Sequence, residues 1–266
     1  MAEQHTVENN ETVTRSKQYD FITEIVVEGL PGAGKTSTII GLAEHYALRH
    51  TDTVVFVNGK PHEYRQDERA VSNFLKMRYD PDIRQRRILT CSCIGVRMAA
   101  DRLEAYERMR QEHEKTGKKV LNLMERDDFT AIRLFLPATF LHLQPTSIEW
   151  IDFRGMIDEF DEVAKAVHAV TEPRLVVVVY LDVDAELAFE RVKKRNRPME
   201  IRGFEAWYMQ YLKQAHDIYL GLAVGEDDNM LMPAGRRLSV VHANKYDSNN
   251  VGLVNRVVEE IDRQMT

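Results

Sequence analysis

The sequence of 266 residues has few cysteines, no long apolar run and no excess of positive charge. Its two cysteines, Cys91 and Cys93, are separated by a single residue, which is too close for an easy disulfide and too sparse for a zinc site. We therefore expect a reducing, cytoplasmic environment. No apolar run approaches the roughly 20 residues that cross a bilayer, so we expect no membrane partner.

Charge and composition limit the function classes further. The formal net charge is -6, which gives no general attraction to nucleic acid and argues against a nucleic-acid partner. Hydrophobic residues make up 44% of the chain and charged residues 29%, so disordered and collagen-like classes are excluded. Residues 1–19 are polar and lack the apolar stretch of a signal peptide, and we expect them to form a flexible N-terminal tail.

Apolar periodicity predicts alternating strands and helices. The segment Phe21–Val27 is rich in β-branched residues and ends at a glycine-rich turn, and Thr36–His50 carries apolar residues at helical spacing. Helical patterns separate most of the four further predicted strands, which are Thr53–Val57, Val120–Met124, Leu175–Asp182 and Leu238–His242. This alternation favours an α/β fold, with a doubly wound, five-stranded parallel sheet and flanking helices.

One long amphipathic helix is predicted between Arg84 and Glu114. Apolar residues recur there every three or four positions, which is typical of a helix with one face in the core. The residues expected on that face are Leu89, Cys93, Val96, Ala100 and Leu103.

A phosphate-binding loop is the clearest motif. The pattern G-x-x-x-x-G-K-T lies between the first strand and the first helix and comprises Gly29, Leu30, Pro31, Gly32, Ala33, Gly34, Lys35 and Thr36, with Ser37 next. In such a loop backbone N–H groups point at phosphates, the lysine reaches the β- and γ-phosphate oxygens, and the threonine hydroxyl holds Mg²⁺. The motif predicts ATP or GTP binding, but not whether the γ-phosphate goes to water, a small molecule or a protein.

Two charged segments follow the loop. Glu125, Arg126 and Asp127 come directly after a predicted strand, at the edge where open α/β sheets bind ligands. Five positive charges then occur within the seven residues from Arg191 to Arg197. Taken alone, the first segment is equally compatible with a solvated strand end, and the second is better explained by a solvated helix end or a nucleic-acid patch. Beside a phosphate loop, the second is better explained as an arginine-rich lid over the transferred phosphate.

With these three motifs in order, the chain resembles the deoxynucleoside kinases, the family that includes the insect and mitochondrial deoxynucleoside kinases and the herpesvirus thymidine kinases. The resemblance extends from about Phe21 to about Tyr219. Glu125 and Arg126 match the first two residues of the family's Glu-Arg-Ser motif, and Tyr208–Leu220 looks like its Tyr-Leu...His...Tyr helix. The family's lid pattern of spaced arginines followed by a glutamate is matched by Glu190-Arg191, Arg195, Arg197 and Glu200.

The resemblance implies that residues 20–266 form one P-loop kinase domain, which transfers the γ-phosphate of ATP to the 5′-hydroxyl of a deoxynucleoside, thymidine or another, in nucleotide salvage. It implies catalytic roles for Lys35, Arg126 and the lid residues Arg195 and Arg197. Family members are commonly homodimers, so a homodimer is expected.

The same resemblance implies binding roles. Arg191 and Arg195 would contact ATP phosphates, and Glu125 would join Thr36 at Mg²⁺. Arg126 would lie near the 5′-hydroxyl and the acceptor phosphate, and Glu125 would also bind the substrate. Glu200 and Tyr79 would bind the sugar 3′-hydroxyl, although Tyr79 is equally compatible with a core aromatic.

The sequence departs from the family at its general base. The family has a Glu-Pro pair after the second strand, whereas this chain has Lys60-Pro61. A lysine with a pKa near ~10.4 is a poor base beside phosphates, so we expect Glu63, three residues on, to take that role. The family's base-reading glutamine is absent near Leu89–Ser92, so base preference is not predicted.

Two other functions stay open. Thymidylate kinases share the phosphate loop, an acidic-arginine motif and a lid, and their acceptor phosphate requires no general base. The segment Tyr180–Asp184 also resembles theirs. A catalytically decayed scaffold protein is the alternative outside enzymes, but it would be expected to lose Lys35, Thr36 and Arg126, and all three are present.

Overall fold

The computed structural model describes residues 19–58, 84–135, 137, 148–196, 206–223, 231–246 and 251–266. The predicted tail, apart from Tyr19, lies outside these ranges. None of the helices in the described part is long and apolar enough to span a membrane.

A parallel sheet of five strands forms the centre of the protein, in the order β2-β3-β1-β4-β5. The strands are β1 (Ile22–Gly29), β2 (Thr53–Asn58), β3 (Lys119–Glu125), β4 (Leu175–Asp182) and β5 (Arg237–His242). Each overlaps a strand predicted from the sequence, and the predicted α/β class is confirmed. Val177 to Leu181 of β4 are fully or almost fully buried, as their unbroken apolar run predicts for a strand covered on both faces.

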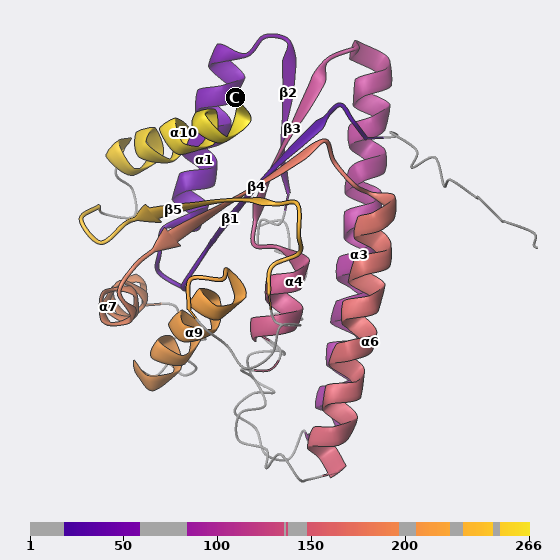
Figure 1. Cartoon of the computed structure of the whole chain (residues 1–266), viewed down its shortest axis with the longest axis vertical. Coiled ribbons are helices and arrows are strands. Elements are labelled where there is room, and N and C mark those ends of the chain that lie inside the picture. The colour runs from indigo at the N-terminus through magenta and orange to yellow at the C-terminus, as the bar shows by residue number, and fades with distance from the viewer. Residues whose placement is uncertain are drawn as a thin grey trace, which may run out of the picture.

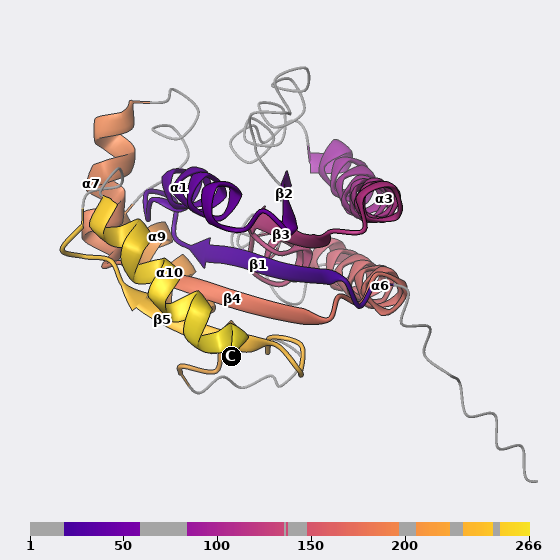
Figure 2. The same cartoon turned by 90° about the horizontal axis from the view of Figure 1, so that it is seen from above.

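Helices cover both faces of the sheet (Figures 1 and 2). On one face, α1 (Lys35–Arg49) packs against α10 (Val251–Met265). On the other, the long helices α3 (Arg84–Thr116) and α6 (Ile148–Val170) lie side by side. Shorter elements lie near the ends of the strands, namely α4 (Asp128–Thr130), the π-helix η3 (Ala131–Phe135), α7 (Ala185–Arg195) and α9 (Ala206–Tyr219).

The predicted core face of α3 is wrong in the part whose side chains are described. Ala100 and Leu103 are exposed. The buried positions are instead Arg102, Ala105, Tyr106 and Met109. Arg102 and Tyr106 turn inward because both bind the buried carboxylate of Glu24 on β1. A polar pair therefore sets the orientation of the helix, and apolar spacing alone does not reveal it.

Candidate active site

The phosphate loop joins β1 to α1 at the carboxyl edge of the sheet, as predicted. Gly29 and Gly34 have positive φ angles of 141° and 97°, which L side chains rarely adopt. A Cβ on Gly29 would also lie 2.8 Å from the carbonyl oxygen of Leu181 on β4. A Cβ on Gly32 would meet the Ala188 carbonyl of α7. The glycines therefore let the loop pack directly against its neighbours.

Lys35, the first residue of α1, is buried under this loop. Its Nζ atom donates hydrogen bonds to the carbonyl oxygens of Gly29, at 3.0 Å, and Leu30, at 2.8 Å. Burial and the nearby charge of Arg126 lower the pKa of Lys35 to about 7. An anionic phosphate beside the amine would favour its charged form.

Thr36 and Glu125 connect the loop to the second motif. β1 and β3 are paired with Val27 opposite Glu125, so the end of β3 lies beside the loop. The Thr36 hydroxyl donates a hydrogen bond of 2.7 Å to Oε2 of Glu125. Hydroxyl and carboxylate oxygens are the donors that Mg²⁺ prefers, so this pair suits a magnesium ion next to the phosphate loop.

Arg126 follows in an unusual backbone conformation. Its φ angle is 72°, which is uncommon for a residue other than glycine. Its backbone N–H donates to the Val27 carbonyl at 3.2 Å. Its guanidinium lies over the Phe135 ring, 4.0 Å from the ring centre, and burial lowers the pKa of Arg126. The side chain is thus held at the carboxyl edge, close to both Lys35 and Glu125.

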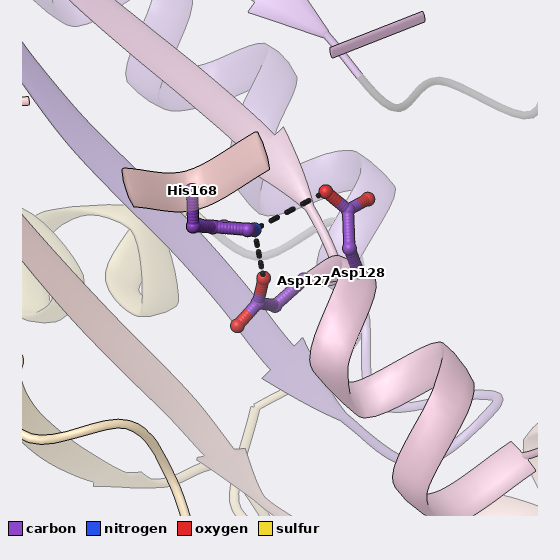
Figure 3. A group of neighbouring side chains, drawn as sticks. All are labelled: Asp127, Asp128 and His168. Atoms are coloured by element: carbon purple, nitrogen blue, oxygen red, sulfur yellow. Dashed lines mark hydrogen bonds and ion pairs between the residues drawn. The ribbon is translucent and has the colours of Figure 1, made fainter. Parts of the chain in front are cut away.

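Asp127, the residue after Arg126, belongs to a separate polar cluster (Figure 3). Its carboxylate pairs with Arg236 and accepts a hydrogen bond from Tyr219 at 3.3 Å. Burial opposes ionisation, but Arg236 and His168 outweigh it and lower the pKa of Asp127 to about 2.

The same cluster has the composition of a cation site, with Asp127, Asp128 and His168 close together. Arg236 also donates to Nδ1 of His168 at 3.4 Å, which leaves the His168 Nε2 proton for Asp128 Oδ2 at 3.3 Å. Arg236 already supplies the positive charge, so the cluster is best understood as an internal ion-pair network.

The arginine-rich segment begins in α7, which packs on the loop at Gly32. Arg195 is exposed at the end of α7, close enough to Lys35 to contribute to its lowered pKa. Arg191 donates to the Tyr246 carbonyl. Five residues named from the sequence lie outside the described residues, so their roles stay predictions: Lys60, Glu63, Tyr79, Arg197 and Glu200.

Two neighbours of Arg126 were given no role from the sequence, although His216 is the histidine of the Tyr-Leu...His...Tyr pattern. Glu28, the last residue before Gly29, is fully buried, and burial raises its pKa. His216 of α9 is also fully buried, and burial together with Arg126 lowers its pKa to about 3. The available signal for Glu28 was its place between the predicted strand and the glycine of the loop, where a charged side chain is unusual if it becomes buried.

Comparison with known proteins agrees with this geometry. A five-stranded parallel sheet with a phosphate loop after its central strand defines the class of P-loop kinase folds. A family model described as deoxynucleoside kinase matches residues 25–262. The protein therefore belongs to the deoxynucleoside kinase family. It is also 26% identical over 228 residues to "Uncharacterized protein ORF44" of Ostreid herpesvirus 1 (isolate France). The aligned region covers 77% of this chain and 74% of the viral protein.

Proposed function

We propose that the protein, as one P-loop kinase domain over residues 20–266, transfers the γ-phosphate of ATP to the 5′-hydroxyl of a deoxynucleoside. Family membership supports phosphoryl transfer. The observation that carries the proposal is the position of Glu125 and Arg126 beside the phosphate loop, with Glu125 Oε2 only 2.7 Å from the Thr36 hydroxyl. The site for ATP, the phosphate donor, and the site for the deoxynucleoside, the phosphate acceptor, would then share one edge of the sheet.

Each group at this edge has a task in that reaction. Lys35 would leave the Gly29 and Leu30 carbonyls for the phosphates, where its charge offsets the negative charge of the transition state. Thr36 and Glu125 would hold Mg²⁺, which neutralises charge on the phosphate oxygens when bound. Arg126 would orient the acceptor oxygen. The lid residues Arg191, Arg195 and Arg197 would contact ATP phosphates, with Glu200 and Tyr79 at the sugar.

A substrate panel with labelled ATP tests the proposal. The four deoxynucleosides and thymidylate are offered to the wild-type protein and to Lys35→Ala. We expect one or more deoxynucleosides to be phosphorylated, and Lys35→Ala to lower turnover by about 10² to 10³ because the phosphates lose their loop cation. A folded Lys35→Ala protein with wild-type turnover would disprove the assignment of the phosphate site.

Lys60 favours a second candidate, a nucleoside monophosphate kinase. A lysine in place of the family's glutamate suits an acceptor phosphate, which needs a cation and no general base. If the acceptor is a nucleoside, Glu63→Gln should cost about 10²-fold in rate, the usual size for a general base. If it is thymidylate, Lys60→Ala should raise KM instead, and Glu63→Gln should have little effect.

A further inference from the structure

Glu28 lies between the phosphate loop and the segment that follows Arg126, but it has no part in the chemistry proposed above. It is the residue of β1 that precedes Gly29, and none of its surface is exposed. A buried carboxylate is costly unless its contacts repay the loss of water. The hydrogen bonds that the Glu28 side chain accepts both come from the segment that directly follows Arg126.

One oxygen of Glu28 caps the segment after β3. Oε1 accepts a hydrogen bond from the backbone N–H of Asp127 at 2.7 Å and another from the Thr130 hydroxyl at 2.6 Å. Asp127 occupies the N-cap position of α4, yet its own side chain makes no capping hydrogen bond. Glu28 therefore supplies from β1 an acceptor that a helix N-terminus needs.

These bonds hold Arg126 from both sides. The Arg126 N–H is bonded to Val27, and the next N–H along the chain is bonded to Glu28. Between them the backbone of Arg126 is kept at a φ of 72°, a conformation that costs about 1 kcal/mol or more without such support.

The guanidinium is held through the same segment. Thr130, anchored by Glu28, directly precedes the π-helix that ends at Phe135. The Arg126 guanidinium lies over the Phe135 ring, 4.0 Å from the ring centre. Phe135 also packs against the ring of His216, with ring centres 5.7 Å apart. Both the backbone and the side chain of Arg126 therefore depend on the Oε1 contacts.

We propose that Glu28 is a positioning residue for phosphoryl transfer, which fixes Arg126 against the phosphate loop through the two hydrogen bonds accepted by Oε1. This inference rests on the proposed function of Arg126. A displacement of about 1 Å in a group that orients a reactant costs up to about 100-fold in rate, so the contact matters for kcat more than for nucleotide binding.

Two substitutions of Glu28 separate hydrogen bonding from bulk. Glu28→Gln keeps a carbonyl oxygen for the Asp127 N–H and the Thr130 hydroxyl, whereas Glu28→Leu fills similar space without an acceptor. We expect Glu28→Leu to lower kcat about 10- to 100-fold with unchanged ATP affinity. Glu28→Gln should stay within about threefold of the wild-type kcat, because one oxygen acceptor suffices for both bonds.

A matched pair of smaller changes serves as the control. Thr130→Val removes one hydroxyl bonded to Glu28, and Tyr106→Phe removes one hydroxyl bonded to the other buried glutamate of β1, Glu24, at 2.6 Å. Thr130→Val should lower kcat about two- to tenfold, the net value of one typical hydrogen bond. Tyr106→Phe should leave kcat unchanged and affect only the melting temperature.

Hydrogen exchange gives a readout that does not depend on activity. In Glu28→Leu, but not in Glu28→Gln, the amides of residues 126–135 should exchange faster, because the turn loses its anchor. A wild-type protein that phosphorylates no member of the substrate panel would refute the proposed function. Unchanged exchange or unchanged kcat in folded Glu28→Leu would refute the positioning role, and so would an equal loss of kcat in Glu28→Gln.

Discussion

The two buried glutamates of β1, Glu24 and Glu28, lie four residues apart on the same side of the strand, yet their hydrogen bonding differs. Both oxygens of Glu24 are bonded: Arg102 binds Oε1 at 3.3 Å, and Tyr106 and Asn122 donate to Oε2 at 2.6 and 2.9 Å. Glu28 accepts two bonds on Oε1, but its Oε2 has no hydrogen-bond partner among the described residues.

The pKa values of the two glutamates are therefore shifted in opposite directions. Burial alone would raise both pKa values, but Arg102 and Tyr106 outweigh it and lower the pKa of Glu24. For Glu28, burial prevails over Arg126 and Thr130 and the pKa is raised. One strand therefore carries a fully compensated charge in its interior and an incompletely compensated one beside the phosphate loop. The comparison suggests that Glu24 serves stability and that Glu28 serves the site.

The atoms around Oε2 of Glu28 reinforce the contrast. His216 Nδ1 donates to the Leu212 carbonyl at 2.6 Å, so the neutral ring presents a bare Nε2. That Nε2 lies 4.0 Å from Glu28 Oε2, and neither atom has a hydrogen-bond partner among the described residues. Nη1 of Arg126 is enclosed in the same way. Polar atoms enclosed without partners cost stability, and such costs concentrate at functional sites.

The largest effect should come from the cation of the compensated cluster. Arg102→Met would leave the Glu24 carboxylate buried without its ion-pair partner, so the free energy of unfolding should fall by about 3–5 kcal/mol. Urea unfolding measures this loss. In the protein that remains folded, kcat should equal that of the wild type, and a kcat that falls with stability would erase the distinction between the two glutamates.

Replacing the cation beside Glu28 should have the opposite effect, a loss of activity with little loss of stability. Arg126→Met should lower kcat about 10²-fold, because the group that orients the acceptor oxygen is lost. Stability should change little, since burial already disfavours the charged guanidinium and its Nη1 is unpaired among the described residues. Steady-state kinetics and urea unfolding on the same preparation test this. A stability loss as large as that of Arg102→Met would contradict it.

Much of this arrangement could be predicted from the sequence. Each strand is a local run of apolar or β-branched residues, and the phosphate loop is a contiguous motif, so neither depends on distant contacts. Parallel pairing of β1 with β3 then brings Glu125 and Arg126 to the loop without further information. The sheet and the approach of the first two motifs were predictable for this reason.

The polar clusters were not predictable in the same way. Glu28 meets Asp127 and Thr130 across about a hundred residues of chain, and Arg236 reaches Asp127 from still farther along it. Such pairs depend on side-chain geometry in the folded state. The orientation of α3 was mistaken for a related reason, because hydropathy treats Arg102 as a surface residue and the pair with Glu24 buries it.

The smallest effect should be a gain in stability at Glu28. In Glu28→Gln the amide group keeps an oxygen for Asp127 and Thr130 and offers an N–H to the bare Nε2 of His216. We expect the free energy of unfolding at neutral pH to rise by about 1 kcal/mol, the net value of one buried hydrogen bond. Glu24→Gln should instead lower it, because Arg102 loses its counter-charge.

The pH dependence of these two differences sharpens the test. Since the folded pKa of Glu28 is raised, its ionisation destabilises the fold as pH rises above the unfolded value of 4.5, and the advantage of Glu28→Gln should grow over that range. The folded pKa of Glu24 is lowered, so its stabilising charge is present above 4.5 and is lost as pH falls through the folded value. Urea unfolding of both variants and the wild type from pH 2 to pH 8 measures the two trends. Stability differences that run parallel for the two variants would mean that the two glutamates are equivalent after all.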